Sequence, residues 1–339
     1  MNWTVSVNYL LLRDFFFVTV AVIALLPELS PAQDGRRLRA GYASLSGNMA
    51  PYWAGKDAGI YKKYGLDIDL VAFPSGAEGM AAMIAGEIEF LAIAGSTTAS
   101  AAIGGSDVVS LAITTERLVS SLMTIPSIQR AEELRGKAVG ISRFGTSIDT
   151  AARMALHHYG LEAMKDVMLV QVGAVSSGLA SLRGGRIQGA ILSYPALIPA
   201  RREGFRELLD IASLGVPYAS TGITVRKSFM NQRRDVVTNY VKSILEATAR
   251  IKRDKAFTID MMMKYFRTKD REMMEETYEV SVTKYLKRVP TPTAESFRTV
   301  VDELALVNPK AKGQDPKRFY DDSILQELDK SGFINSLNR

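Results

Sequence analysis

The 339-residue sequence contains no cysteine. This excludes disulfide bonds, metal sites built from thiolates and an N-terminal cysteine that carries a lipid. Histidine is almost absent too, since its two copies are the neighbours His157 and His158 within one expected helix. Adjacent residues point to different faces of a helix, and no third histidine exists to complete a zinc site or to act as a second general base. Zinc and triad chemistry therefore receive little support.

The glycine-rich signatures of nucleotide-binding proteins are also missing. Neither Gly-x-Gly-x-x-Gly nor Gly-x-x-x-x-Gly-Lys-Ser/Thr occurs in the sequence. Carboxylates recur at alternate positions, as Asp67 with Asp69 and Glu87 with Glu89, and this spacing is typical of the solvated face of a strand. We therefore predict no catalytic residue, no cofactor and no metal site.

The excess of positive charge is small. Lysine and arginine number 42 and aspartate and glutamate 36, which gives a net charge of +6 at pH 7. The local basic clusters at Arg201-Arg202, Arg233-Arg234 and Lys310 to Lys312 contain no interleaved aromatic residues. This pattern argues against nucleic-acid binding and is at most a weak indication of an anionic ligand.

Long apolar runs are missing except near the N-terminus. The segment from Phe15 to Leu26 is apolar apart from one threonine and follows Arg13. Its length suits the core of a signal peptide and falls short of the ~20 residues needed to cross a bilayer. We therefore expect residues 1–32 to be a signal peptide cleaved near Ala32, and the mature protein to be periplasmic without a lipid anchor. A retained membrane anchor is the alternative.

What the sequence does contain is a repeated transition from strand to helix. The stretch from Lys137 to Asp149 runs from a short apolar strand through a glycine turn into Thr146 and Ser147, residue types that begin helices. A similar sequence pattern occurs 98 positions earlier. Its residues Arg39, Ala40, Ser44 and Gly47 correspond to Lys137, Ala138, Ser142 and Gly145. The repeat predicts two lobes of similar architecture.

The order of the expected elements predicts an α/β fold of the two-lobed type, in which each lobe is a mainly parallel sheet flanked by helices. The expected strands are 39–44, 66–73, 88–94 and 108–114, then 137–142, 167–172, 187–193 and 208–212, and finally 221–225. Segments 114–122 and 217–222 are expected to cross between the lobes as a two-segment hinge. The domains would then be 33–118 (lobe 1), 119–219 (lobe 2) and 220–339 (return to lobe 1, then helices).

Ligands of open parallel sheets bind at the carboxyl ends of strands, where helices begin. The loops expected there are rich in glycine and hydroxyl groups, and a helix beginning at Ser75 has Glu78 at capping-box spacing. The candidate ligand-binding residues are Ser44, Gly47, Asn48, Trp53, Ser75, Gly76, Ser96, Thr97 and Glu116 from lobe 1, and Arg143, Gly145, Thr146, Ser147, Gly173 and Tyr194 from lobe 2.

Three of these candidates have specific expected roles and specific alternatives. Trp53 and Tyr194 would form apolar walls, although Trp53 could equally pack its helix on the sheet. Arg143 would pair with a carboxylate, phosphate or sulfonate, unless it is simply solvated. Each of these turns, taken alone, would be only an ordinary helix cap, and it is their convergence in the predicted sheet topology that favours a binding site.

Several segments together resemble the periplasmic substrate-binding proteins of ABC transporters in the nitrate, sulfonate and taurine group, with the related pyrimidine-precursor binders. These segments are Arg39 to Ser44, Ala58 to Ile68, Ala85 to Phe90, Leu134 to Gly140 and Gly145 to Ser147. The resemblance implies a type II periplasmic-binding fold that closes on a small solute and docks on a membrane permease. A relative that makes the thiamine pyrimidine uses an active-site histidine and a cysteine-rich motif, and this chain lacks any cysteine.

We therefore expect a non-enzymatic, monomeric receptor that captures a small anionic or heteroaromatic organic solute and delivers it to the permease of an ABC importer. An enzyme on the same scaffold, such as a dehydratase or lyase acting on a small carboxylic acid, is one alternative. A sensory module that reports its ligand to a membrane kinase is another.

Overall fold

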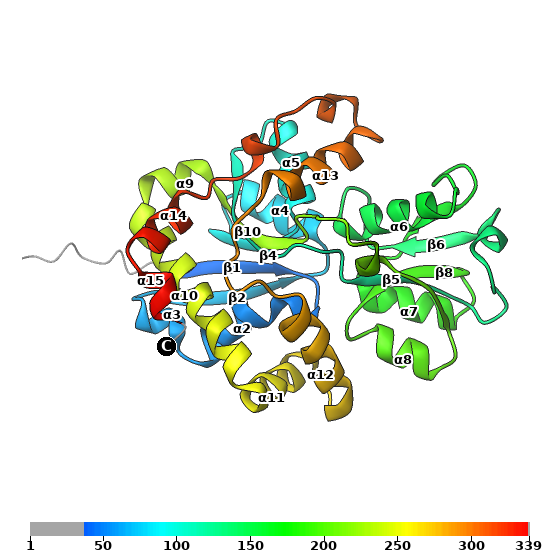
Figure 1. Ribbon diagram of the computed structural model, residues 1–339, viewed down its shortest axis with the longest axis horizontal. Coiled ribbons are helices and arrows are strands. Elements are labelled where there is room, and N and C mark those ends of the chain that lie inside the picture. The colour runs from blue at the N-terminus through cyan, green and yellow to red at the C-terminus, as the bar shows by residue number, and fades with distance from the viewer. Residues whose placement is uncertain (1–36, 338–339) are drawn as a thin grey trace, which may run out of the picture. The chain divides into compact units, whose positions relative to one another are not determined.

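The structure is a computed structural model that describes residues 37–337. The predicted signal peptide at residues 1–32 lies outside these residues. Leu38–Arg339 forms one compact unit, and its strands make two five-stranded sheets, one in each of two lobes (Figure 1). Among the described residues, none of the helices combines the length and apolar character needed to cross a membrane.

Lobe 1 is built on a sheet with the strand order β2-β1-β3-β10-β4. Its strands are β1 (Leu38–Ala43), β2 (Ile68–Phe73), β3 (Phe90–Ile93), β4 (Val108–Thr115) and β10 (Thr221–Arg226). β1 pairs in parallel with β2 and β3, whereas β10 runs antiparallel to both of its neighbours. All residues of β3 and β4 are buried, which is typical of strands covered on both faces.

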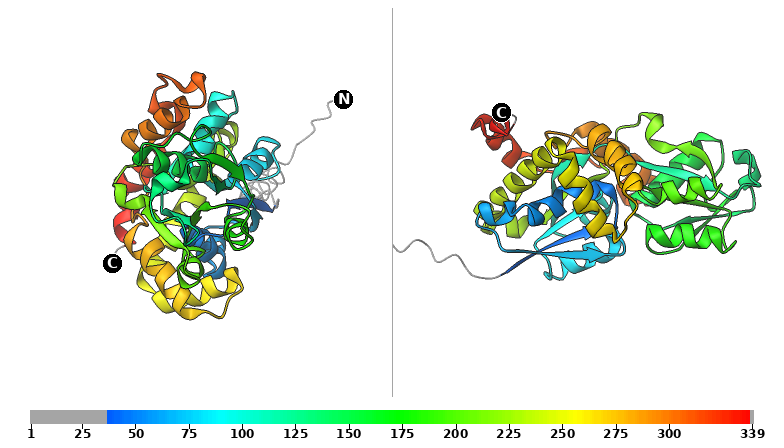
Figure 2. Two further views of the ribbon diagram at one scale, coloured as in Figure 1. Left: turned by 90° about the vertical axis from the view of Figure 1, so that its right-hand side faces the viewer. Right: turned by 90° about the horizontal axis from the view of Figure 1, so that it is seen from below.

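Helices from two parts of the chain pack on lobe 1. The first group is α2 (Ala50–Asp57), α3 (Ile60–Lys63), α4 (Gly76–Ile84) and α5 (Gly95–Ile103). The second is α9 (Lys227–Gln232), α10 (Arg234–Arg253), α11 (Lys255–Phe266), α12 (Arg271–Tyr278), α13 (Ala294–Ala305), α14 (Ser323–Lys330) and α15 (Phe333–Ser336). α10 contacts α2, α13 contacts α5 and α14 contacts β4. The right-hand view of Figure 2 shows these yellow to red helices over the lobe that holds the blue strands.

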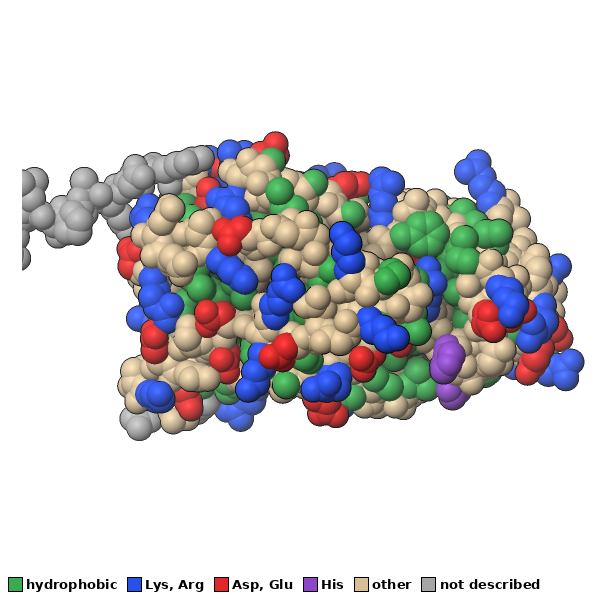
Figure 3. Space-filling view, turned by 90° about the horizontal axis from the view of Figure 1, so that it is seen from above, with side chains coloured by type: hydrophobic (Ala, Val, Ile, Leu, Met, Phe, Trp, Pro, Cys, Tyr) green, Lys and Arg blue, Asp and Glu red, His purple; other side chains and the backbone are tan. Residues whose placement is uncertain are grey.

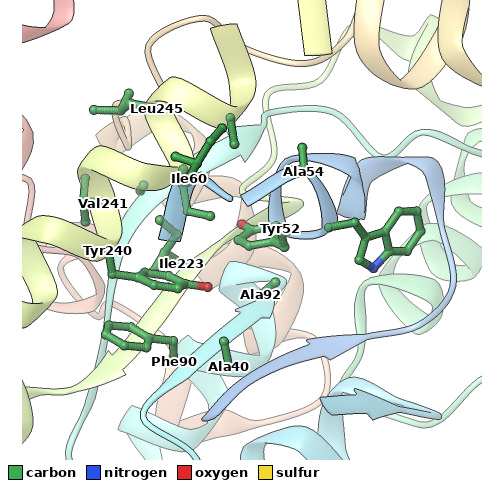
Figure 4. Packing of buried hydrophobic residues seen from close by; sticks show 14 of the residues in the cluster. Ala40, Tyr52, Ala54, Ile60, Phe90, Ala92, Ile223, Tyr240, Val241 and Leu245 are labelled. Carbon is green, nitrogen blue, oxygen red and sulfur yellow. The ribbon is translucent and has the colours of Figure 1, made fainter. Parts of the chain in front are cut away.

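The buried ring of Tyr240 in α10 belongs to the core of lobe 1 and lies beside Phe90 (Figure 4). This ring stacks on Phe90 of β3, with centroids 3.8 Å apart, and on Tyr61 of α3, with centroids 5.7 Å apart. Such aromatic pairs contribute about 0.5–1.5 kcal/mol beyond the burial of their area. These contacts pack α10 and α3 against the sheet of lobe 1.

Lobe 2 repeats this plan on a sheet with the order β7-β6-β8-β5-β9. Its strands are β5 (Ser120–Thr124), β6 (Ala138–Ile141), β7 (Met168–Gln171), β8 (Gly189–Ser193) and β9 (Arg206–Asp210), and its helices are α6 (Ser147–His158), α7 (Val175–Arg183) and α8 (Leu197–Arg202). β6 pairs in parallel with β7 and β8, while β5 is antiparallel to β8 and β9. The order β7-β6-β8 matches β2-β1-β3 of lobe 1, so the predicted fold class is confirmed.

The chain crosses between the two sheets twice. It passes from β4 into β5 and later from β9 into β10, so both of the predicted crossings between the lobes are present. The structure corrects one detail, because residues 120–124, expected to lie largely within the crossing, form the strand β5. All five residues of β5 are buried. A strand that pairs on both sides with segments far along the chain gives no local signal beyond its short apolar run.

The surface of the molecule mixes both charge signs. On the face shown in Figure 3, lysine and arginine side chains alternate with aspartate and glutamate, and the two histidines lie together. His157 and His158 are both exposed at the C-terminal end of α6, where a positive charge would be favoured by the helix dipole. They take no part in the cavity described next.

Candidate functional site

The N-terminal ends of α4, α5 and α6 all contribute to one cavity between the lobes, which we call the polar cavity. From lobe 1 it is lined by Ala43, Ser44, Ser46, Asn48, Met49, Pro74, Ser75, Gly76, Ile93, Ala94, Thr97, Ser220 and Thr221, and from the first crossing and lobe 2 by Leu118, Val119, Ser120, Ser142, Thr146, Ser147, Ile148 and Ser193. Eight are serines and three are threonines, and none carries a charged side chain. Recognition in this cavity must therefore rely on hydroxyl, amide and backbone groups.

The volume of the polar cavity is about 80 Å³. One water needs ~10–15 Å³ on this measure. The cavity therefore suits a compact group of a few non-hydrogen atoms rather than a whole drug-sized molecule.

Three buried polar atoms of the polar cavity have no hydrogen-bond partner within the described protein. They are Asn48 Oδ1, Ser75 Oγ and Thr97 Oγ1. Buried polar groups in folded proteins are almost always hydrogen-bonded, and leaving one unpaired costs about 1–3 kcal/mol. Three such groups on one wall are the expected arrangement for a site that completes its hydrogen bonds with a ligand.

Ser75 shows how the fold keeps one of these groups free. It is the N-cap residue of α4, yet its side chain makes no cap hydrogen bond. The predicted capping box with Glu78 does not form, because the Glu78 carboxylate instead accepts a hydrogen bond from Arg143 Nη2 at 2.9 Å. The Ser75 hydroxyl therefore remains available at a helix N-terminus, where backbone N–H groups also favour oxygen acceptors.

The opposite wall, from lobe 2, is held rigid by its own hydrogen bonds. Thr146 Oγ1 lies 3.0 Å from Ser142 Oγ and donates to the carbonyl of Arg143 at 2.7 Å. Asp149 Oδ2 accepts the backbone N–H of Gly145 at 2.9 Å and its Oδ1 accepts from Arg153 Nε at 2.9 Å. These bonds fix the turn that leads into α6 before any ligand arrives.

A family model described as NMT1/THI5 like matches residues 46–254, which include most of both walls of this site. The chain belongs to the NMT1/THI5-like family. A curated relative from Brucella abortus, which carries the provisional name of a binding protein, is 26% identical over 207 residues. That match spans 59% of this chain and 60% of the relative's length.

Solved structures of other proteins share the fold of this NMT1/THI5-like chain. A protein from Bordetella bronchiseptica RB50 has a TM-score of 0.76 at 17% identity, covering 87% of this chain and 97% of that one. The alkanesulfonate-binding protein SsuA from Xanthomonas axonopodis pv. citri has a TM-score of 0.69 at 16% identity, covering 84% and 95%. The periplasmic nitrate-binding protein NrtA from Synechocystis PCC 6803 has a TM-score of 0.71 at 12% identity, covering 87% and 88%. These similarities confirm the periplasmic-binding fold.

The polar cavity brings together seven of the candidate residues predicted from the sequence. They are Ser44, Asn48, Ser75, Gly76, Thr97, Thr146 and Ser147. All seven follow a strand end or begin a helix, which is the feature used to select them. The other eight candidates do not line the polar cavity.

Trp53 belongs to the core of lobe 1 and not to a wall of the cavity. Its side chain is fully buried, and its ring stacks on Tyr265 with centroids 4.7 Å apart and meets the ring of Phe266 edge-on at 5.4 Å. The alternative interpretation, in which Trp53 packs its helix, is the one that the structure supports. Ser96 is also buried, in the first turn of α5, but does not line the cavity.

Glu116 lies in the first crossing and holds the hinge. Its carboxylate accepts hydrogen bonds from Lys287 Nζ at 2.9 Å and from Thr293 Oγ1 at 2.5 Å. Burial alone would raise the pKa of Glu116, but the hydrogen bonds from Thr293 and Lys287 outweigh it and lower the pKa. The residue is therefore an anion already paired with protein groups, away from the polar cavity.

Arg143 does not reach the polar cavity and pairs with Glu78 instead. Glu78 is in lobe 1 and Arg143 in lobe 2, so this pair bridges the lobes at the surface. The partner lies 65 positions away in the sequence, which is why sequence reasoning could not assign it.

Two glycines among the candidates shape turns and line neither wall. Gly145 and Gly173 have φ values of +76° and +85°, a region that favours glycine. The N–H of Gly173 donates to the carbonyl of Ser142 at 3.2 Å. Both glycines therefore allow the backbone to turn next to the cavity.

Gly47 and Tyr194 join the lobes through their backbones. The N–H of Gly47 donates to the carbonyl of Tyr194 at 3.3 Å. A Cβ on Gly47 would lie 2.4 Å from Ser281 Oγ, and the Tyr194 ring is largely buried beneath the Arg201 guanidinium, 5.5 Å from its centroid. Gly47 has no side chain, and the Tyr194 side chain does not line the polar cavity.

Several lining residues were missed by sequence reasoning. The polar ones are Ser120, Ser142, Ser193, Ser220 and Thr221, whereas Ser46 lies in the turn from Ser44 to Asn48 that was expected at the site. Ser142 directly follows β6 and Ser193 is the last residue of β8, while Ser120 and Ser220 flank the two crossings. A search for hydroxyl groups at every strand end and in both hinge segments would have found these four.

Proposed function

We propose that this chain is an extracytoplasmic solute-binding receptor whose two lobes close around a small solute in the polar cavity. The observation that carries the proposal is the set of buried, unpartnered groups on Asn48, Ser75 and Thr97, three residues that line a cavity shared by both lobes. The named functions of proteins with the same fold support it, since these proteins bind alkanesulfonates and nitrate.

We propose that the chain acts by binding and not by turnover. None of the residues lining the polar cavity is an aspartate, glutamate, histidine, lysine, arginine or tyrosine. General acid–base and most nucleophilic mechanisms need such a group within hydrogen-bond reach of the substrate. The lining therefore offers groups that recognise a solute and none that would move its protons.

The chemistry of the polar cavity favours a solute with a compact oxygen-rich group. An anion there would be held by hydroxyl groups and by the N–H groups of three helix N-termini, without a neighbouring cation. Micromolar binding needs about 8 kcal/mol, and hydrogen bonds to a charged group contribute about 1.5–3 kcal/mol each. Four or five such bonds are sufficient after the cost of closure.

Delivery of the solute to the permease of an ABC importer, and a periplasmic location, are part of the proposal. They are supported by the periplasmic sulfonate-binding and nitrate-binding proteins that share the fold. The curated relative is matched over 60% of its length, so its partners are inferred from the fold and the site together.

Isothermal titration calorimetry tests this proposal. The panel contains nitrate, small sulfonates, carboxylates and pyrimidines, each titrated into the chain and into the double variant Ser75→Ala/Thr97→Val. We expect at least one compound to bind, and the double variant to bind it about tenfold more weakly because two hydrogen bonds are lost. Turnover of a bound compound, or equal binding by the double variant, would contradict the proposal.

A further inference from the structure

A second and larger cavity adjoins the polar cavity, and we call it the apolar cavity. Its volume is about 570 Å³, against about 80 Å³ for the polar cavity. Ser44 and Pro74 line both cavities, so the two meet at the end of β1 and of β2. Together they fall within the range of about 300–1,000 Å³ that is usual for sites of organic ligands.

The lining of the apolar cavity differs in chemistry from that of its neighbour. Eleven of its fourteen lining residues are apolar. Lobe 1 contributes Leu45, Phe73, Phe266 and Met273, and lobe 2 contributes Leu179 together with prolines and alanines. An apolar group between the lobes would therefore be enclosed by both of them.

The one charged residue of the apolar cavity is neutralised by its own lobe. Arg183 donates from Nε to Glu203 Oε2 at 2.7 Å and forms a second hydrogen bond to the same carboxylate. This paired geometry leaves no free cation to bind an acidic ligand inside the cavity. The apolar cavity is thus suited to hydrocarbon rather than to a second polar group.

Leu45 shows that this apolar surface is incompletely covered by protein. Its side chain lines the apolar cavity and is 49% exposed. The neighbouring Ser44 has a φ of +74°, a left-handed conformation that is uncommon for serine. Such strain persists only where the surrounding structure imposes it, and it is concentrated at functional sites. The strained residue here lines both cavities.

We infer that the solute is amphiphilic, with a compact polar head in the polar cavity and an aliphatic or aromatic body in the apolar cavity. This inference rests on the proposed function and specifies its substrate class. It follows from the adjacency of a small hydroxyl-lined chamber to a larger hydrocarbon-lined one. Burying the apolar body would add affinity that the polar cavity alone cannot supply.

Matched pairs of probes test the inference by calorimetry. The pairs are acetate with octanoate, ethanesulfonate with octanesulfonate, and acetamide with octanamide, so that each pair shares a head and differs in body length. For the head that binds, we expect the eight-carbon member to bind at least about tenfold more tightly than the two-carbon member, because each buried methylene strengthens binding.

Three variants distinguish specific from adventitious binding. Leu45→Gln should reduce the preference for the eight-carbon probe by about threefold. The matched control Leu306→Gln changes a leucine that is 71% exposed and lines neither cavity, and it should leave the preference unchanged. Ser75→Ala/Thr97→Val should weaken both members of the pair, because both place their head in the polar cavity.

The possible outcomes separate this inference from the proposed function. Equal affinity for the short and long members of the binding pair would overturn the inference and leave the receptor proposal standing. Long-chain binding that survives Ser75→Ala/Thr97→Val would also overturn it. The probe would then bind nonspecifically through its apolar chain, without its head in the polar cavity. Absence of binding by every probe would overturn the inference and would contradict the receptor proposal as well.

Discussion

At the scale of single residues, the site depends on polar groups that the fold leaves without partners. Ser75 occupies a capping position without capping, and Thr97 and Asn48 each keep a buried oxygen unpaired. An unpaired buried group normally destabilises a protein. Their clustering around one cavity is the observation on which the proposed solute site rests.

Substituting Ser75 should therefore separate stability from binding. Ser75→Ala is expected to change the melting temperature by no more than about 1 °C, because no cap hydrogen bond is lost, and to weaken solute binding about fivefold. Asp254 is a matched comparison, since its carboxylate accepts the N–H of Phe257 at 3.1 Å at the start of α11. Asp254→Ala should lower stability by about 1 kcal/mol and leave binding unchanged. Melting curves and calorimetry measure the two effects. A loss of stability without a loss of binding in Ser75→Ala would refute the role of Ser75 in solute binding.

Glu303 in α13 makes stability depend on pH. Its Oε2 is buried without a partner, and burial raises its pKa above 4.5, although His157 and Arg153 partly oppose this. A folded-state pKa above the unfolded value means that stability falls as the pH rises through this range. Glu303→Gln should raise the melting temperature by about 2 °C at pH 7 and give no gain at pH 4. Glu87→Gln, at an exposed position, is the control, and an equal gain at both pH values would exclude the proposed cause.

The candidate site was predictable where residue type and helix start coincide. The occurrence of serine and threonine at strand ends selected Ser44, Ser75 and Thr146, which line the polar cavity. Arg143 and Trp53 were misplaced because their environment is set by Glu78 and Tyr265, which are distant in the sequence. A side chain long enough to reach several partners cannot be assigned from its neighbours alone.

At the scale of elements, the strand β10 ties the returning chain into the sheet of lobe 1. It lies between β3 and β4 and is antiparallel to both. Sequence reasoning placed this strand correctly and missed the corresponding strand β5 of lobe 2. Both are short, but β10 carries a Thr-Gly-Ile-Thr-Val pattern in which Thr221 to Val225 are mostly β-branched, whereas β5 reads Ser-Ser-Leu-Met-Thr and has one β-branched residue.

Gly222 is required for β10 to pack. A Cβ at this position would lie 2.0 Å from the carbonyl oxygen of Ala112 in β4. Gly222→Ala is therefore expected to destabilise the fold by about 1–3 kcal/mol. Gly184→Ala is the control, because an added Cβ there meets nothing closer than 3.4 Å. Chemical denaturation compares the two, and equal stabilities would show that β10 can shift to accommodate a methyl group.

Helix α12 of lobe 1 is joined to α8 of lobe 2 by ion pairs. Arg201 Nη1 lies 2.8 Å from Glu276 Oε1, and Arg202 Nη2 lies 2.9 Å from Glu272 Oε2. Together with the pair between Arg143 and Glu78, they link the lobes in the conformation described. All of these side chains are partly exposed, so salt should weaken their contribution.

Removing the ion pairs between α8 and α12 should weaken solute binding at low salt concentration only. Glu272→Gln/Glu276→Gln is expected to weaken binding about two- to threefold at low ionic strength, because the closed arrangement loses stabilisation, and to have no effect near 0.5 M salt. Glu162→Gln removes an ion pair with Lys165 inside lobe 2. This control variant should leave the affinity for the solute unchanged at both salt concentrations. A defect that persists at high salt would show that these carboxylates act in another way.

At the scale of the whole molecule, the internal repeat predicted the two lobes of similar architecture that the structure shows. Ala40 and Ala138, 98 positions apart, lie in β1 and β6, which occupy the same place in the two sheets. The sequence could not specify how the lobes meet, because the contacts between them are made by pairs such as Arg201 with Glu276, 75 positions apart. The cavity between the lobes is a product of those distant contacts.

The central claim is that the two lobes close on a solute in the polar cavity, and the distance between the lobes tests it most directly. Ile84 in α4 and Met168 in β7 are 51% and 52% exposed, one in each lobe. The native chain has no cysteine, so Ile84→Cys/Met168→Cys provides two unique sites for spin labels. Pulsed electron paramagnetic resonance should show a shorter and narrower distance distribution when a solute that binds by calorimetry is added. An unchanged distribution with that solute bound would contradict the account.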